Sequence, residues 1–562
     1  MRSDRWASAN EKRKVLSKDA AGPVLWYDNG ERYTHANEGH SLSLGVSGAG
    51  KSRRGTIPMT LSFIMNKESG VIIDPKGEIY KHTINYVTDE YKVFVLNFRK
   101  LYEENIQGWN PLSAPYELWK TGIGENVNRA EQMIEEMAHA MYPIDKNEDP
   151  FWPKEARNLF IATVYALFTY AKPEQVNMPS LYYMISQGDE RIGAGTYLKE
   201  FCSQIADNEN VTMQLQSYVS TASDTRACIK SAFLDGLSIA TKSKSIREFL
   251  SHDDLHINDL RGDVPTLIYI ILPDETPIYD DLAGVLVFQL MNHFVKLAEQ
   301  KYMGKLPIRL NVCLEELGNV GRAITNLPHL LSAGRSRNIR IQLILQSMSQ
   351  LVDIFGKSNA DTIIDNADVK IAYRINNWET LTELSRLCGE REIVMNGHIS
   401  REPLITQSQL AAMETGQALV IISGRTKFIT WLPDFTEMYP MVSQELPKKI
   451  TQGRKKQKKS PSYFNVKAYV DRIRDKKIKE LLGDSNNNDM LNEGELPNVN
   501  AAREYINTEE MIKKIEAKIA ELEAQEKAEQ EKKAQESGTQ TEEAEEVTIS
   551  DIFGDQDELP FS

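Results

Sequence analysis

The sequence predicts an α/β fold in which a parallel β-sheet domain is interrupted by an all-α domain and followed by a tail. Apolar strand-like runs alternate with helical segments on both sides of a long stretch that has helical periodicity alone. Such alternation is typical of parallel sheets. The composition then changes after the second sheet-forming stretch. We therefore expect an N-terminal segment, two parts of one domain around an all-α domain, a basic neck and an acidic tail, over residues 1–39, 40–111, 112–262, 263–447, 448–483 and 484–562.

A glycine-rich loop follows the first expected strand of this sheet. Gly45, Gly50, Lys51 and Ser52 satisfy the phosphate-loop (P-loop) pattern G-x-x-x-x-G-K-[ST]. Glycines let successive backbone N–H groups face a polyphosphate, the lysine supplies positive charge, and the serine hydroxyl suits Mg²⁺. A glycine turn without function is the alternative, but a strand precedes the loop and a helical pattern follows it. The expected nucleotide contacts are Gly45, Ser47, Gly48, Ala49, Gly50, Lys51 and Ser52.

The other expected strands are short apolar runs. Two follow the loop, at residues 70–74 and 92–96, with helical segments between them. A strand–helix–strand order implies parallel pairing through right-handed crossovers. A strand-like piece lies near Pro23–Tyr27 in the N-terminal segment. The second part of the domain adds runs at residues 266–272, 310–314, 339–345, 369–373 and 418–422.

Residues 112–262 show apolar side chains at helical spacing and no convincing strand. We interpret these stripes as the core of an all-α domain rather than as a cofactor site. Beyond the sheet domain, residues 448–483 carry 13 basic and 3 acidic side chains, whereas residues 484–562 carry 7 basic and 22 acidic ones. A short coiled-coil-like helix is expected at residues 512–522, and disorder after about residue 530.

The composition favours a cytoplasmic protein. The four cysteines lack the paired spacing of a disulfide framework or a zinc site. The N-terminus does not resemble a signal peptide. The longest apolar run, near residues 159–171, is shorter than the roughly 20 residues of a spanning helix.

Two acidic residues, Glu315 and Glu316, directly follow the apolar run at residues 310–314. A phosphate loop needs a carboxylate at the end of a neighbouring strand to hold Mg²⁺ and to orient an attacking water. A surface acidic pair is the alternative. Because the same chain contains a P-loop, we predict that this pair is catalytic.

Five sequence blocks resemble conjugative type IV secretion coupling proteins. They read Cys-Leu-Glu-Glu-Leu-Gly-Asn-Val-Gly (313–321), Leu-Ser-Ala-Gly-Arg-Ser-Arg-Asn-Ile (331–339), Leu-Gln-Ser-Met-Ser-Gln-Leu (345–351), Ile-Asp-Pro-Lys-Gly-Glu (73–78) and Phe-Trp (151–152). They occur in the family's order across residues 39–440, with the helical stretch where its all-α domain lies.

This resemblance implies a RecA-like hexameric ring that uses ATP and Mg²⁺. Lys51 would bind phosphate, and Ser52 and Glu315 would bind Mg²⁺. Glu316 would polarise water, and Gln346 would sense the γ-phosphate. Arg335 would be an arginine finger that reaches the neighbouring subunit's nucleotide.

The implied function is to hand relaxase-bound plasmid DNA to a type IV secretion channel and its ATPase. Two features depart from the family, which usually has Asp at the position of Glu315 and usually carries N-terminal transmembrane helices. We therefore expect a variant from a Gram-positive conjugative element, recruited to the cytoplasmic face of the membrane by a membrane-anchoring partner protein. The alternatives are a soluble hexameric DNA-translocating ATPase outside secretion and an ATP-dependent receptor or scaffold without translocation.

Overall fold

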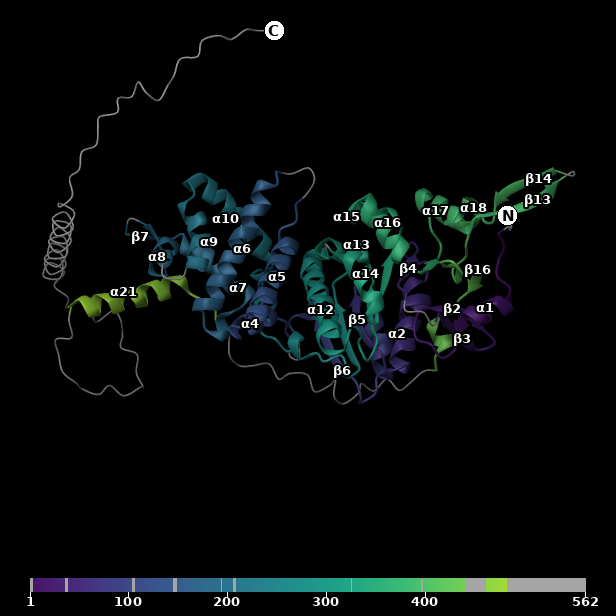
Figure 1. The fold of residues 1–562 in the computed structure, drawn as a ribbon, viewed down its shortest axis with the longest axis horizontal. Helices are drawn as coiled ribbons and strands as arrows, with labels where there is room; N and C mark the ends of the chain where they lie inside the picture. The colour runs from purple at the N-terminus through teal and green to yellow at the C-terminus, as the bar shows by residue number, and fades with distance from the viewer. Residues whose placement is uncertain are drawn as a thin grey trace, which may run out of the picture. The chain divides into compact units, whose positions relative to one another are not determined.

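A nine-stranded sheet carries the P-loop at the end of one of its inner strands (Figure 1). The computed structural model describes residues 4–35, 39–103, 107–144, 149–193, 195–205, 209–324, 326–395, 398–440 and 461–482. Contacts divide the chain into two units, Met1–Leu481 and Leu482–Ser562. The predicted basic run at residues 448–459, the short helix at residues 512–522 and the acidic tail lie outside the described residues. Within them, no helix is long and apolar enough to span a bilayer.

The strand order across the sheet is β16-β15-β12-β4-β11-β10-β5-β9-β6. The seven strands from β12 to β6 pair in parallel, as predicted for a sheet split in sequence. We call the edge where these strands begin the amino edge and the edge where they end the carboxyl edge. The bounds are β4 (Ser41–Leu44), β5 (Ser69–Asp74), β6 (Lys92–Asn97), β9 (Thr266–Ile271), β10 (Leu310–Leu314), β11 (Ile339–Leu345), β12 (Val369–Ala372), β15 (Gln417–Ile422) and β16 (Thr426–Trp431).

Two antiparallel strands extend the predicted parallel sheet at one edge. β15 runs antiparallel to β12, and β16, which was not predicted from the sequence, runs antiparallel to β15. A tight turn containing Gly424, whose φ is 66°, joins them as a hairpin. β16 was missed because it alternates buried and exposed residues, as strands near a sheet edge do, instead of forming an apolar run.

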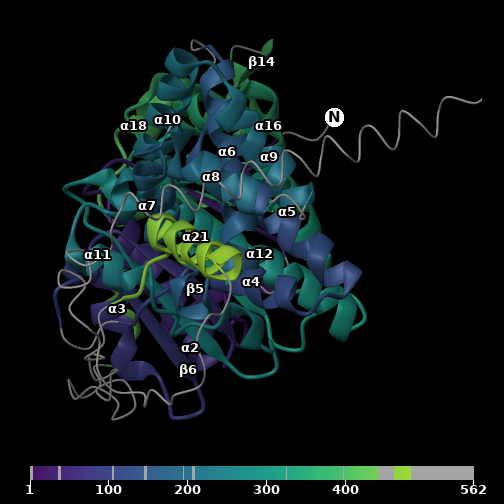
Figure 2. The ribbon, with the colours of Figure 1, turned by 90° about the vertical axis from the view of Figure 1, so that its left-hand side faces the viewer.

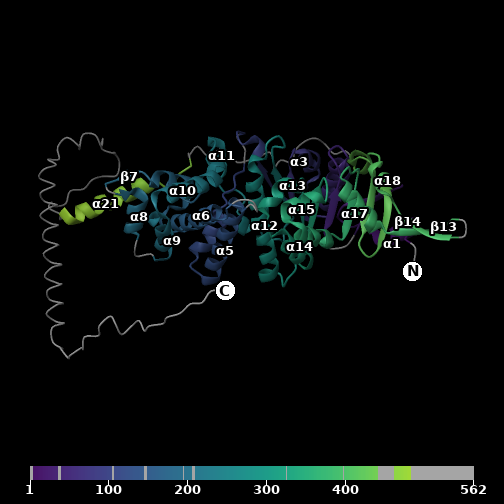
Figure 3. The same cartoon turned by 90° about the horizontal axis from the view of Figure 1, so that it is seen from above.

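Helices cover both faces of the sheet, so its inner strands are buried on both sides. Along β5, Val71 and Ile73 enter one core and Ile72 enters the other. One face holds α2 (Ile57–Met65), α3 (Glu78–Thr83) and α19 (Phe435–Met438). The other face holds α12 (Asp280–Lys301), α13 (Leu317–Val320), α14 (Leu327–Ser336), α15 (Ser349–Phe355), α16 (Lys357–Asn366) and α17 (Trp378–Cys388) (Figure 3).

Eight helices follow between β6 and β9 in the described part of the chain, together with a short hairpin that the sequence did not predict. The hairpin pairs β7 (Arg191–Ile192) with β8 (Gly195–Thr196). The apolar side chains at the predicted helical spacing are buried. A hydrogen bond of 2.9 Å, which Asn292 of α12 donates to Glu136 of α5, connects this helical stretch to the sheet domain. The helices are α4 (Ser113–Lys120), α5 (Gly124–Met141), α6 (Phe151–Tyr170), α7 (Met178–Gly188), α8 (Tyr197–Gln204), α9 (Glu209–Ser220), α10 (Ser223–Leu237) and α11 (Lys244–Phe249).

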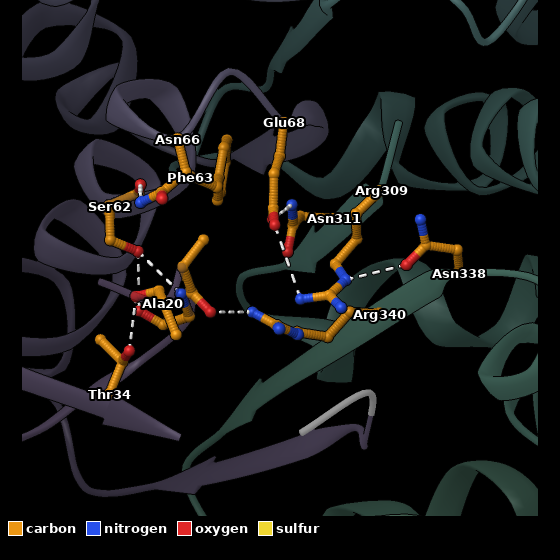
Figure 4. A network of polar contacts seen from close by, with 12 residues as sticks. Ala20, Thr34, Ser62, Phe63, Asn66, Glu68, Arg309, Asn311, Asn338 and Arg340 are labelled. Atoms are coloured by element: carbon orange, nitrogen blue, oxygen red, sulfur yellow. Dashed lines mark hydrogen bonds and ion pairs between the residues drawn. The ribbon is translucent and has the colours of Figure 1, made fainter. Parts of the chain in front are cut away.

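The N-terminal segment is more ordered than the single strand-like piece predicted. It contains α1 (Ala9–Val15) and a three-stranded sheet of β1 (Leu16–Ser17), β3 (Glu31–His35) and β2 (Val24–Asp28). Near the amino edge of the large sheet, the buried Arg340 of β11 donates to the carbonyl of Ala21 at 2.5 Å (Figure 4). The hydroxyl of Ser62 in α2 donates to the carbonyl of Gly22 at 2.8 Å. These contacts join the N-terminal segment to the sheet domain.

Smaller elements complete the described chain. A hairpin of β13 (Glu390–Met395) and β14 (His398–Pro403) follows α17. The helix α18 (Gln407–Ala411) then leads into β15.

The last described part of the predicted basic neck is a docked helix, α21 (Val466–Leu482). In Figure 2, this yellow-green helix lies close to α7 and α8. Phe464, Val466 and Val470 are buried, and the backbone N–H of Phe464 donates to the hydroxyl of Ser180 at 2.9 Å. The ring of Tyr469 packs edge-on against that of Phe201. This docking was not predicted from the sequence, because the few apolar side chains of this segment stand among many charged ones.

We expect Phe464→Ala to release α21 from the all-α domain. Removing a buried aromatic ring costs roughly 3 kcal/mol, more than a single helix of this length offers by its own propensity. Hydrogen exchange of the amides of residues 466–482 should accelerate in this variant. Arg474→Ala, at an exposed position on the same helix, is the matched control. Equal exchange in both variants would contradict the docking.

Candidate nucleotide-binding site

The P-loop leaves the carboxyl edge of the sheet directly after β4. Gly48 and Gly50 have φ values of 75° and 94°, in the left-handed region that favours glycine. Gly45 is required for space, because a Cβ there would lie 3.0 Å from Cβ of Tyr373. The backbone N–H of Gly45 donates to the carbonyl of Leu345 at 3.2 Å, and this hydrogen bond connects the loop to β11. Ser47 is exposed at the loop, whereas Ala49 is buried beneath it.

A helix begins at Lys51 and continues through α2. Its first six residues, Lys51–Thr56, form a widened π-type turn, a feature that is frequent at functional sites. The N-terminal end of a helix presents free N–H groups and a positive dipole, which suit an anion. The loop glycines and this helix start therefore form a phosphate cradle.

Lys51 is folded into the cradle, with only 7% of its surface exposed. Its Nζ donates to the carbonyl of Gly45 at 2.5 Å and to that of Val46 at 3.3 Å. Burial lowers the pKa of Lys51, while the charges of Glu316 and Glu315 oppose that shift. An ammonium that bonds only loop carbonyls is the group that nucleotide phosphates can engage. The residues present therefore fit a polyphosphate.

Glu315 lies at the end of β10 and meets the P-loop directly. The hydroxyl of Ser52 donates to its Oε1. Burial raises the pKa of Glu315 to about 7, the Ser52 hydrogen bond lowers it, and the charges of Asp74 and Glu316 raise it further. A serine hydroxyl beside a buried carboxylate is a hard oxygen donor set, which fits Mg²⁺. The described residues contain no cluster of three His, Cys, Asp or Glu ligands, so nucleotide and water oxygens would complete the coordination.

Glu316 follows with an unusual backbone. Its φ of 53° is left-handed, which is uncommon for a residue other than glycine. It precedes the short helix α13 and is half-buried. Of the nearby carboxylates, Glu316 does most to raise the pKa of Lys51 and so favours its charged form. The turn therefore keeps the second acid of the pair close to the phosphate cradle.

Asp74 is a third acid at the same edge, and it was not among the predicted site residues. It ends β5, the neighbour of β10, and is only 1% exposed. Its Oδ2 accepts the N–H of Tyr80 at 2.8 Å. Burial raises the pKa of Asp74, although several backbone N–H groups oppose the shift. The sequence signal that could have identified it was an acid at the end of an apolar run, followed by Pro-Lys-Gly-Glu.

Gln346 follows β11, the strand between β4 and β10, and so lies at the carboxyl edge beside the loop. Arg335 does not join this group in its own subunit. Helix α14 returns to the amino edge, where Arg335 pairs with Asp368 at 3.0 Å while half exposed. The structure thus brings together the loop, Glu315, Glu316 and Gln346, and leaves Arg335 at the opposite edge.

Two arginines after the loop were also missed. Arg53 contacts the carboxylate of Asp434 at 2.6 and 2.8 Å, and Arg54 donates to the carbonyl of Leu432 at 2.8 Å. Both partners follow β16. These contacts fix the start of the P-loop helix to the segment after the last strand, which had no recognisable sequence motif.

Comparison with known proteins identifies a family and a fold. Residues 5–427 match the family model described as type IV secretory system conjugative DNA transfer. Two conjugal transfer proteins named TraG, from Escherichia coli, are 25% and 23% identical over 404 and 393 residues, which are 68% and 66% of this chain. The alignments span 59% and 58% of the length of those relatives.

Solved structures of the bacterial conjugative coupling protein TrwB, lacking an N-terminal segment, share this fold. The unbound form has a TM-score of 0.58 at 18% identity and covers 79% of this chain and 95% of that one. A TrwB complex with ADP and Mg²⁺ has a TM-score of 0.57 at 19% identity, covering 77% and 94%.

We expect Glu315→Gln to stabilise the protein at high pH when EDTA removes divalent cations. The Glu315 carboxyl has a pKa of about 7 when folded and near 4.5 when unfolded. The folded state therefore binds the proton more tightly, and stability falls as pH rises from 4.5 to 7. The variant lacks this loss, which amounts to up to about 3 kcal/mol.

Thermal unfolding at pH 5 and pH 8 would measure the effect, with Glu414→Gln as the exposed control. The midpoint of Glu315→Gln should exceed that of the wild type at pH 8 and approach it at pH 5. A difference that does not change with pH would contradict the burial of an ionisable group at this position.

Proposed function

The chain belongs to the type IV secretory system conjugative DNA transfer family, and from this membership we propose that it is an ATP-hydrolysing coupling protein. In this role it recruits relaxase-bound plasmid DNA and drives or licenses its transfer into a type IV secretion channel. One observation carries the proposal: the P-loop hydroxyl of Ser52 meets the strand-end carboxylate of Glu315. This arrangement suits nucleotide hydrolysis, and membership of the family suggests that hydrolysis is coupled to DNA transfer.

The proposed chemistry assigns a task to each residue at the carboxyl edge. The loop N–H groups and Lys51 bind the phosphates, and Ser52 with Glu315 would hold Mg²⁺. When bound, the metal neutralises charge that develops on the β- and γ-phosphates. Glu316 orients and polarises the attacking water, and its left-handed turn keeps it near Lys51. Gln346 is placed to sense the γ-phosphate.

The glutamate at position 315, where the family usually has aspartate, is compatible with this assignment. The extra methylene extends the carboxylate farther from the strand, and it already accepts the hydroxyl of Ser52. Because Glu315 is buried, its position is fixed by packing rather than by solvent.

We further propose that the active form is a homo-hexameric ring at the cytoplasmic face of the membrane. A membrane-anchoring protein would recruit it there, next to the channel ATPase. Arg335 supports a contact between subunits, since its guanidinium is half exposed and far from its own P-loop edge. In this arrangement Arg335 leaves Asp368 and reaches the neighbouring nucleotide.

We expect Lys51→Ala to remove productive ATP binding and Glu316→Gln to keep binding but lose hydrolysis. Lys51 supplies phosphate charge, whereas a group that positions or deprotonates water contributes roughly 10²–10⁴ in rate. Titration with a fluorescent ATP analogue and a phosphate-release assay separate the two effects. Lys199→Ala, at an exposed position on α8, is the control. ATP affinity equal to that of the wild type in Lys51→Ala would refute the phosphate assignment.

Arg335→Ala and Lys51→Ala subunits should complement each other in mixed rings. An arginine finger contributes about 10³–10⁵ in rate, and a mixed ring restores some interfaces in which both residues are present. Phosphate release measured across mixing ratios should therefore pass through a maximum. If both variants assemble and no ratio restores hydrolysis, the role across the subunit interface is wrong.

Phosphate release with DNA present and a relaxase-binding assay together distinguish the coupling function from its alternatives. DNA-stimulated hydrolysis is expected of a coupling or translocating ATPase and not of a passive receptor. Binding of a relaxase, measured with the purified proteins, is expected of a coupling protein and not of a translocase outside secretion. Absence of both responses would leave only the receptor or scaffold role.

A further inference from the structure

A cavity of about 660 Å³ lies at the amino edge of the sheet domain, away from the P-loop. Its walls come from the N-terminal segment with α1, the turn between β15 and β16, the start of β12 and the end of α17. The N–H of Ala7 donates to the carbonyl of Lys427 at 3.0 Å, which fixes the N-terminal wall against β16 (Figure 1). The cavity and the P-loop are separated by the length of the strands, since Lys370 is at the start of β12 and the loop follows the end of the paired β4.

The side chains that line this cavity include more cations than carboxylates. Two of its cations are paired: Arg5 with Glu11 at 2.6 Å, and Lys427 with Asp4 at 2.5 Å. Within the described part of the chain, no carboxylate lies at ion-pair distance from the other three, which are Lys14, Lys370 and Arg425. These three cations come from three different elements and share one cavity.

Lys370 is the most informative of the three because it is only 5% exposed. Its Nζ donates to a single backbone carbonyl, that of Ala367, at 2.7 Å. Asp365, Asp368 and Glu383 act on it only from longer range. A buried charge without a close counter-ion is costly to keep. An anion placed in the cavity would offset that cost.

On the side of the cavity that Lys370 shares, the floor is apolar and is formed by Leu387 and Ile421. The phosphates of a nucleic-acid backbone would pair with the cations, but the apolar floor would remain in contact with phosphates and water. An acidic peptide with an aliphatic side chain satisfies both surfaces, since its carboxylates pair with the cations and its aliphatic group covers the floor.

We propose that this cavity is a docking site for an acidic peptide segment of a protein partner. One carboxylate of the segment pairs with Lys370 inside the cavity, while others pair with Lys14 and Arg425 at its rim. An aliphatic side chain rests on the floor. This site works without nucleotide, so its failure and the failure of the proposed ATPase function are separate results.

The test starts from an array of dodecapeptides in which each position is varied and nucleotide is absent. The array should select peptides enriched in Asp and Glu with one aliphatic residue. A fluorescein-labelled peptide of this composition then reports affinity by anisotropy. Lys14→Glu with Arg425→Glu should weaken binding at least tenfold, because two attractive contacts become repulsive. Lys242→Glu with Arg191→Glu, at exposed positions elsewhere, is the matched control and should bind as the wild type does.

Lys370→Met tests the buried charge separately from the rim. This variant should lose peptide affinity without lowering the thermal unfolding midpoint, because the methionine fills similar space without an unpaired charge. A lower midpoint with unchanged peptide affinity would identify a structural lysine and overturn the proposal. Lys51→Ala should bind the peptide normally.

Four further outcomes would overturn the proposal. The array could select no acidic peptides, or a version of the peptide with Gln at every Glu could bind equally well. The rim variant could bind with the affinity of the wild type. Finally, a twelve-residue oligothymidylate could bind more tightly than the peptide and displace it, which would assign the cavity to nucleic acid.

Discussion

The contact between Ser52 and Glu315 depends on the order of the strands in the sheet, and so does the rest of the site. β4 and β10 are separated by one strand, β11, so the P-loop and the acidic strand end meet at the same edge. The intervening strand places Gln346 between them, and the next strand adds Asp74. Parallel strands make this convergence general, because all their carboxyl ends lie at one edge of the sheet. The long all-α insertion does not disturb it, since β9 returns to pair with β5.

The sequence could predict what is encoded locally. Buried parallel strands are apolar runs, and the P-loop is a compact motif, so eight of the nine sheet strands could be predicted from the sequence. The sequence also pointed to the P-loop, Glu315, Glu316 and Gln346, which lie at the carboxyl edge, but not to Asp74 beside them. β16 was missed because its burial alternates and its pairing is fixed by a hairpin. The docking of α21 was not predicted because it depends on three apolar side chains that pack against the all-α domain, which is far away in the sequence. Arg335 lies at the amino edge because α14 leads back to the start of β11, which is parallel to β10.

The two edges of the sheet bury side chains of opposite charge. At the carboxyl edge, Glu315 and Asp74 are buried close together, and burial raises the pKa of both. Cations there, whether Lys51 or a divalent metal, relieve the repulsion. At the amino edge the buried groups are cationic: Arg340 is satisfied in part by the carbonyl of Ala21, and Lys370 by that of Ala367. Each edge is therefore suited to a ligand of a different charge.

The ion pair between Arg335 and Asp368 bears on how a ring could use this fold. With Arg335 half exposed, the pair contributes about 1 kcal/mol or less. An arginine finger lowers the barrier by several times that amount, because a rate factor of about 10³ corresponds to roughly 4 kcal/mol. Leaving Asp368 would thus cost little compared with the gain at a neighbouring nucleotide. The pair can hold Arg335 in the isolated chain without preventing its use across an interface, so its presence here and a role in a ring are energetically compatible.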